Sequence, residues 1–213
     1  MEKGETIEII PGILVHSLKE LKEALHKLSW AKKVHIDIMD GKFVHNKTIQ
    51  ALTLKKALPK MEMQIHLMAN KPHTYINKFA RLGAKELIIH AEATKKRAET
   101  LEMIRETGMK AGIAFNPTTK VDKDAVKHAD TALVMTVHPG HSGQMLIKAP
   151  LRKIAEIRKC NPIIIINVDG GINSHTCGLV ARTGADYAVA THAVTNAPEP
   201  KKTYKELMRK CNK

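Results

Sequence analysis

The chain has 213 residues, of which 43% are hydrophobic and 26% are charged, and its formal net charge is +14. This length suits one large α/β domain with a substantial core. No apolar run reaches the length of a membrane span, which argues against a membrane protein. The three cysteines are scattered and odd in number, which argues against a disulfide framework or a cysteine zinc site.

The positive charge raises the question of nucleic-acid binding. Lys and Arg are spread along the whole length, and only 3% of residues are aromatic, which leaves little for base stacking. We therefore favour a lysine-rich solvated surface that attracts anionic metabolites. Residues 1–5 are charged and lack the apolar stretch of a signal peptide, and the isolated cysteines suggest reduced thiols, so we expect a cytoplasmic protein.

Apolar, β-branched runs alternate with amphipathic stretches along the whole chain. Ser17 and Pro72 mark helix starts. The pattern predicts strands over 7–14, 33–39, 61–68, 86–90, 110–115, 131–137, 162–168 and 186–190. It predicts helices over 17–28, 48–58, 72–82, 94–107, 122–128, 150–159, 174–182 and 201–211.

Eight strand–helix units with short connections predict a parallel sheet, and their number favours a closed (β/α)8 TIM barrel. We expect residues 1–213 to form one barrel domain with its active site at the C-terminal ends of the strands. The alternative is a doubly wound open sheet, which would need fewer strands and a Gly-rich turn after the first one. Here Pro11-Gly12 interrupts the first strand instead.

The second predicted strand carries titratable side chains on one face. Alternation along a strand places His35, Asp37 and Met39 on one side and Val34 with its apolar neighbours on the other. A core strand does not normally carry an imidazole and a carboxylate on an inner face unless something binds them. The alternative is a half-exposed edge strand.

Other predicted strands also end in polar residues. The third delivers His66, the fourth ends at His90-Ala91-Glu92 and the seventh at Asp169. Two His and two Asp at one barrel mouth form a plausible set of ligands for Zn²⁺, Fe²⁺, Mn²⁺ or Co²⁺. His90 and Glu92 are candidates for structural residues or for hydrogen-bond partners of a metal-bound imidazole.

Two glycine-containing loops follow adjacent strands. They are 137–144 after the sixth strand and 169–174 after the seventh. Glycines allow backbone N–H groups to approach an anion closely, and phosphate sites of (β/α)8 barrels lie near such loops. Ordinary Gly-containing turns are the alternative interpretation.

Several motifs together resemble one family. His-Ile-Asp-Ile-Met-Asp-Gly-Lys-Phe-Val (35–44), Ile-His-Leu-Met (65–68), His-Ala-Glu (90–92), Asn-Pro-Thr-Thr (116–119), Met-Thr-Val-His-Pro-Gly-His-Ser-Gly-Gln (135–144) and Val-Asp-Gly-Gly-Ile (168–172) occur in that order. The chain resembles the ribulose-phosphate 3-epimerase family from roughly Pro11 to Ala193. The resemblance implies a barrel of the ribulose-phosphate-binding type that interconverts D-ribulose 5-phosphate and D-xylulose 5-phosphate, in a homo-oligomer such as a dimer or larger assembly.

The resemblance also implies residue roles. One divalent metal ion would be held by His35, Asp37, His66 and Asp169, and the two aspartates would exchange protons at C3 as acid and base. Three methionines near the reacting carbons would be Met39, Met68 and Met135, although plain core packing explains them equally well. Substrate or phosphate would bind at Gly12, His66, Gly140, His141, Ser142, Gly143, Gly170, Gly171, Thr191 and His192.

Six residues in four motifs depart from the family pattern. Gly12 stands where the family has a substrate-contacting Ser, His45 where it has Pro, and His141-Ser142 where it has Phe-Gly. Thr191-His192 replaces the family's Gly-Ser, which helps to hold phosphate through its backbone. A protonated His192 would add positive charge there. These changes leave the metal and acid–base set intact but alter the substrate-binding periphery.

Three alternatives follow. The same chemistry could act on another ketose phosphate, such as a hexulose 6-phosphate. A related barrel that decarboxylates or condenses sugar phosphates is disfavoured, because the lysine of its Asp-x-Lys-x-x-Asp pattern is absent around His35–Asp40. A non-catalytic phosphate-binding barrel would use its basic surface for a macromolecule, and a salt-dependent nucleic-acid affinity would reveal it.

Overall fold

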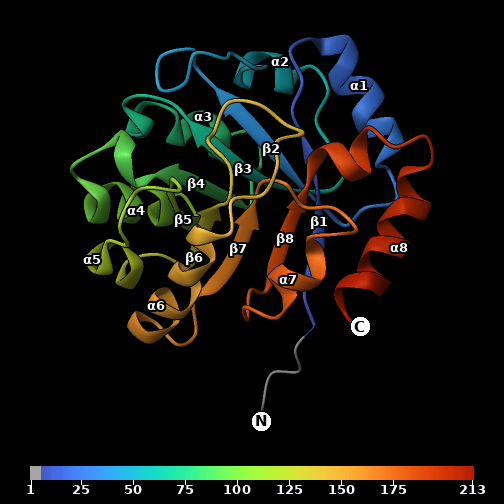
Figure 1. Cartoon of the computed structure of the whole chain (residues 1–213). Helices are drawn as coiled ribbons and strands as arrows, with labels where there is room; N and C mark the ends of the chain where they lie inside the picture. The colour runs from blue at the N-terminus through green and yellow to red at the C-terminus, as the bar shows by residue number, and fades with distance from the viewer. Residues whose placement is uncertain (1–5) are drawn as a thin grey trace.

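The computed structural model describes residues 6–213, and in this part of the chain eight parallel strands close into a barrel ringed by helices (Figure 1). Every strand pairs in parallel with the next, and β8 pairs with β1. The predicted (β/α)8 barrel is confirmed, and the open-sheet alternative is excluded. Residues 1–5, on which part of the cytoplasmic expectation rests, lie outside the described residues.

The helices of residues 6–213 include none that is long and apolar enough to cross a membrane. The strands are β1 (Glu8–Ile13), β2 (Lys33–Met39), β3 (Glu62–Met68), β4 (Glu86–His90), β5 (Lys110–Phe115), β6 (Thr131–Met135), β7 (Ile165–Asp169) and β8 (Tyr187–Ala190). The α-helices are α1 (Leu18–Lys27), α2 (Ala51–Lys55), α3 (Ile76–Ala80), α4 (Arg97–Glu106), α5 (Lys123–Lys127), α6 (Arg152–Cys160), α7 (Cys177–Ala181) and α8 (Pro200–Cys211). Shorter helical turns are η1 (Pro72–Thr74), η2 (Ala91–Ala93), η3 (Ala149–Leu151) and η4 (Thr191–Thr195).

The strand β2 shows how alternation sorts side chains in this barrel. Val34, Ile36 and Ile38 are fully buried in the main apolar cluster that the strands share with the helices. His35 and Asp37 are buried as well but are not part of that cluster. Because β2 pairs with β1 on one side and β3 on the other, it is not the edge strand of the alternative interpretation.

The helix predicted over 48–58 is shorter than expected, because its first residues bind back to β2. The Thr48 hydroxyl donates to the carbonyl oxygen of Asp37 at 2.8 Å and accepts the N–H of Met39 at 2.9 Å. The Gln50 amide donates to the Met39 carbonyl oxygen at 2.8 Å. These bonds hold 48–50 extended beside the end of β2, and α2 begins only at Ala51.

The seventh strand begins at Ile165 instead of Pro162, because residues 162–163 form a turn. The Arg158 guanidinium donates to the carbonyl oxygens of Pro162 at 3.1 Å and Ile164 at 2.6 Å, so those oxygens are engaged outside the sheet. The strand then continues to Asp169, one residue beyond its predicted end. Asp169 is thereby fixed by the sheet.

Candidate active site

A pocket opens at the C-terminal ends of the strands and encloses about 670 Å³, counting its open mouth. The loop after β6 lies over this end of the barrel (Figure 1). The Asn46 amide, in the loop after β2, donates to the Gly140 carbonyl oxygen at 2.7 Å and so joins two sides of the mouth. The pocket is lined by Leu14, Asp37, Met39, Met68, Met135, Val137, Pro139, Gly140, His141, Ser142, Gly143, Gln144, Asp169, Gly170, Gly171, Ile172, Asn173, Val189, Thr191, His192 and Ala193.

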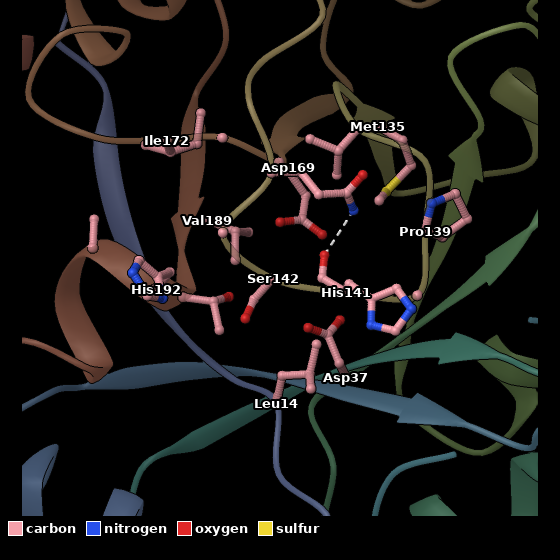
Figure 2. A pocket seen from close by; sticks show the side chains of 18 of the residues that line it. Leu14, Asp37, Met135, Pro139, His141, Ser142, Asp169, Ile172, Val189 and His192 are labelled. Atoms are coloured by element: carbon pink, nitrogen blue, oxygen red, sulfur yellow. Dashed lines mark hydrogen bonds between the residues drawn. The ribbon is translucent and has the colours of Figure 1, made fainter. Parts of the chain in front are cut away.

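Two carboxylates and two imidazoles meet at the floor of this pocket. One ligand atom from each of His35, Asp37, His66 and Asp169 lies within 4.8 Å of those of the others. Asp37 Oδ1 is 2.9 Å from His66 Nδ1 and 3.4 Å from His35 Nε2. Asp169 Oδ2 is 3.7 Å from His66 Nδ1 and 4.0 Å from His35 Nε2. Figure 2 shows the carboxylates of Asp37 and Asp169 pointing toward each other across the pocket.

Register explains why these side chains meet. Asp37 on β2 is paired with His66 on β3, and each faces the barrel interior. Asp169 ends β7. Going around the barrel from β2 in the direction away from β3, one passes β1 and β8 before reaching β7. The two imidazoles are completely buried and lie behind the carboxylates, which are the members of the group that line the pocket.

A buried chain of polar side chains orients His35. Its Nδ1 is 2.7 Å from Gln64 Oε1, and the Gln64 amide donates to Glu86 Oε2 at 2.8 Å. Lys33 Nζ lies 2.9 Å from the same carboxylate oxygen. Because an amide oxygen only accepts, Nδ1 of His35 carries a proton, and Nε2 faces Asp37 and Asp169, where it can offer a lone pair to a metal ion.

His66 is oriented by a second chain on its other side. Its Nε2 lies 2.8 Å from His90 Nε2, and His90 Nδ1 lies 3.3 Å from Glu92 Oε2. Glu92 Oε1 accepts the N–H of Asn116 at 3.0 Å. One consistent set of tautomers has His66 donating to His90 and His90 donating to Glu92, which leaves His66 Nδ1 as a lone pair facing the carboxylates. The structure thus places His90 and Glu92 beside a candidate ligand.

The electrostatics of the group favour a cation at its centre. Burial lowers the pKa of His35, but the adjacent Asp37 carboxylate and the charge of Asp169 raise it to about 9. Burial and the charge of Asp37 raise the pKa of Asp169 to about 7. Burial also raises the pKa of Asp37, yet the neighbouring imidazoles of His35 and His66 hold it below its ordinary value. Positive charge is therefore stabilised between the carboxylates.

A divalent metal ion fits this group. His35 Nε2 is buried and has no hydrogen-bond partner, as expected of an atom reserved for a ligand. Each imidazole is anchored through its other nitrogen, which is the usual arrangement of metal-bound histidine. Two nitrogen and two carboxylate donors suit Zn²⁺, Fe²⁺, Mn²⁺ and Co²⁺ alike, so the donor set does not select among them.

The three methionines of the sequence prediction surround the carboxylates. Met39, Met68 and Met135 are each at most 2% exposed, and all three line the pocket. Register pairs Met39 with Met68, and Met135 with Asp169. Their thioethers give the floor a polarizable and water-poor wall.

The glycines of the two loops allow the loops to pack against each other. A Cβ on Gly170, which has φ of 119°, would lie 2.8 Å from the backbone nitrogen of Val137. A Cβ on Gly171 would lie 2.5 Å from the backbone nitrogen of Leu146. Glycine is therefore required at both positions for close packing, and the resulting loops, 140–143 and 170–171, line one side of the pocket.

Most residues predicted to bind substrate or phosphate lie together around the pocket. Those that line it are Gly140, His141, Ser142, Gly143, Gly170, Gly171, Thr191 and His192, whereas Gly12 and His66 do not line it. Sequence reasoning missed Gln64 and Glu86 as partners of His35. A signal was available for Gln64, which precedes His66 by two residues and so shares its strand face.

Comparison with known proteins gives a consistent result. The model of the Ribulose-phosphate 3 epimerase family matches residues 8–195. The ribulose-phosphate 3-epimerase of Bacillus subtilis is 37% identical over 214 residues, covering 94% of this chain and 98% of the relative, and that of Synechocystis is 36% identical, covering 92% and 90%. The fold is similar to that of KGPDC from Streptococcus mutans, with a TM-score of 0.69, 14% identity and coverage of 97% of both chains.

Proposed function

The chain belongs to the ribulose-phosphate 3-epimerase family, and from this we propose that it interconverts D-ribulose 5-phosphate and D-xylulose 5-phosphate by proton transfer at C3. It is an isomerase of the epimerase type. The proposal of proton transfer at C3 rests on one observation. The carboxylates of Asp37 and Asp169 face each other across the pocket, next to the buried imidazoles of His35 and His66.

Inversion at a carbon next to a ketone requires proton removal on one face and proton delivery on the other. One aspartate, as carboxylate, takes the C3 proton and an enediolate forms. The other, as carboxylic acid, returns a proton to the opposite face. In the metal-free site the pKa of Asp169 is raised to about 7 while that of Asp37 is held low, so the two carboxylates differ in their affinity for a proton. The roles exchange with the direction of reaction.

The same four side chains would hold the metal ion, His35 through Nε2 and His66 through Nδ1. When bound, the ion supplies Lewis-acid stabilisation of the developing negative charge on the substrate oxygens, an effect of several kcal/mol. Gln64 and His90 keep the two imidazoles in the required tautomers. The methionine wall keeps water from the enediolate.

The glycine loops support a phosphate-bearing substrate. Backbone N–H groups of 140–143 and 170–171 border the pocket, and His141 and His192 add imidazoles at its rim. A second candidate is the same epimerisation on a hexulose 6-phosphate, and Gly12, His141 and Thr191-His192 are the features that favour it, because they alter the substrate-binding periphery.

We further propose that residues 1–213 form one domain, that the protein lies in the cytoplasm, as its isolated cysteines suggest, and that it is a homo-oligomer, as the family resemblance implies. Light scattering of the purified protein gives the mass. A monomer at micromolar concentration would contradict the oligomer.

Substrate identity is tested by supplying the metal-loaded protein with D-ribulose 5-phosphate and, separately, with a 3-epimerisable hexulose 6-phosphate. We expect the pentulose to be converted with the higher kcat/KM. A preference for the hexulose would transfer the proposal to the second candidate, and conversion of neither would overturn it.

A further inference from the structure

Gly12 and Thr191 come from opposite ends of the chain and share one space in the barrel mouth. A Cβ built on Gly12 would lie 1.9 Å from Thr191 Oγ1 and 2.9 Å from Thr191 Cβ. Atoms cannot approach this closely, so a side chain at position 12 would require Thr191 to shift. The side chain of Thr191 therefore fills the space that a side chain at position 12 would need, so the residue types at these two positions depend on each other.

A second contact fixes this arrangement. The turn η4, which starts at Thr191, is a π-helix, a rare form that often marks functional sites. At its other end the buried Thr195 hydroxyl donates to the Gly12 carbonyl oxygen at 2.6 Å. Gly12 thus lies against Thr191 at the start of η4 and is hydrogen-bonded to Thr195 at its end.

The hydroxyl of Thr191 occupies a position suited to a ligand. Gly12 is paired with His35 on the neighbouring strand, so the space above Gly12 adjoins the His cluster. Thr191 lines the pocket, and within residues 6–213 its hydroxyl has no hydrogen-bond partner. Thr195, four residues on, has its hydroxyl engaged and does not line the pocket.

We propose that Thr191 is a substrate-binding residue whose hydroxyl contacts an oxygen of the sugar, not of the phosphate, and that Gly12 is glycine in order to make room for it. The inference rests on the proposed function, since it assumes a sugar phosphate in this pocket. Thr191 in η4, and not a side chain of β1, then forms the pocket wall next to β1. Residues 12 and 191 would together determine which substrate binds.

The test compares Thr191→Val with Thr183→Val, a matched control whose hydroxyl donates to the Val180 carbonyl oxygen at 2.6 Å, outside the pocket. We expect Thr191→Val to raise KM for D-ribulose 5-phosphate about three- to tenfold, the effect of one lost hydrogen bond. Competitive inhibition by inorganic phosphate, which engages only the phosphate loops, should stay unchanged. Thr183→Val should leave KM within about twofold of the wild-type value.

Two results would overturn the proposal. An unchanged KM in Thr191→Val would show that the hydroxyl does not bind the substrate. An equal loss of affinity for inorganic phosphate would assign the hydroxyl to the phosphate. Wild-type turnover is measured in the same series, so failure of the proposed function appears as an inactive wild type and is distinguishable from either result.

The coupling is tested without any assay of turnover. Gly12→Ser alone should lower the melting temperature, because its Cβ collides with Thr191. The double variant Gly12→Ser with Thr191→Gly should recover most of that loss, because the serine then occupies the vacated space. Equal melting temperatures for the single and double variants would refute the shared space.

Discussion

The floor and the rim of the pocket are built in different ways. The floor consists of buried side chains on β2 and β3, whose imidazoles are anchored by further buried partners such as Gln64 behind His35, together with Asp169 at the end of β7. The rim consists of loops in which His141, Ser142 and His192 are exposed. From this contrast we expect the barrel to fix the chemistry and the loops to influence which substrate is admitted.

The largest effect should come from the floor carboxylates. Asp37→Asn and Asp169→Asn each retain shape but remove a proton carrier, and we expect kcat to fall at least about a thousandfold. The circular dichroism spectrum and melting curve should still show a folded barrel. If either variant kept wild-type turnover, the two-carboxylate scheme would be wrong. Removal of the rim imidazole by His192→Ser should change KM more than kcat, which separates rim from floor.

A smaller effect, on metal affinity, is expected from the buried hydrogen-bond partners of the floor imidazoles. Gln64→Leu removes the acceptor that orients His35, and such partners of metal-bound histidines are worth about 10- to 100-fold in metal affinity. Competition with a chromophoric chelator measures this affinity directly. Gln144→Leu is the control, because that amide donates to the His138 and His141 carbonyl oxygens in the rim. Equal metal affinity in wild type and Gln64→Leu would contradict the orienting role.

The smallest effect concerns acid stability. Burial raises the pKa of Glu92, but hydrogen bonds from His90, Thr119 and the Asn116 N–H lower it from its ordinary value of 4.5 to about 2. The folded state therefore favours the carboxylate, and this stabilisation is present above pH 4.5 and lost as pH falls toward 2. Glu92→Gln should melt at a lower temperature than wild type at about pH 7, with the difference shrinking in more acidic buffer. A difference independent of pH would contradict this account.

The floor was largely predictable from the sequence, and the rim was not. Strand alternation alone places His35 with Asp37, and a parallel barrel brings all strand ends together, so the cluster with His66 and Asp169 follows from local patterns. Gln64 could have been found by the same rule. The pairing of Gly12 with Thr191 could not, because it depends on closure between β1 and β8 and on a π-helical turn that no local propensity signals.

The length of α2 and the start of β7 were wrong for a related reason. Their bounds depend on side chains that bind distant backbone, as Thr48 does with Asp37 and Arg158 with Ile164. Such contacts override local propensity and exist only after the chain has folded. The fold class survives these errors because it rests on the number and order of the elements.

The central claim is that the buried floor holds a metal ion that its turnover requires. The direct measurement strips the protein with a chelator, titrates it with Mn²⁺, Co²⁺, Zn²⁺ or Fe²⁺, and follows bound metal and D-ribulose 5-phosphate epimerisation together. We expect both to rise in parallel and to saturate at one ion per chain, with His35→Ala and His66→Ala binding far less. Full turnover by the metal-free protein would contradict the claim.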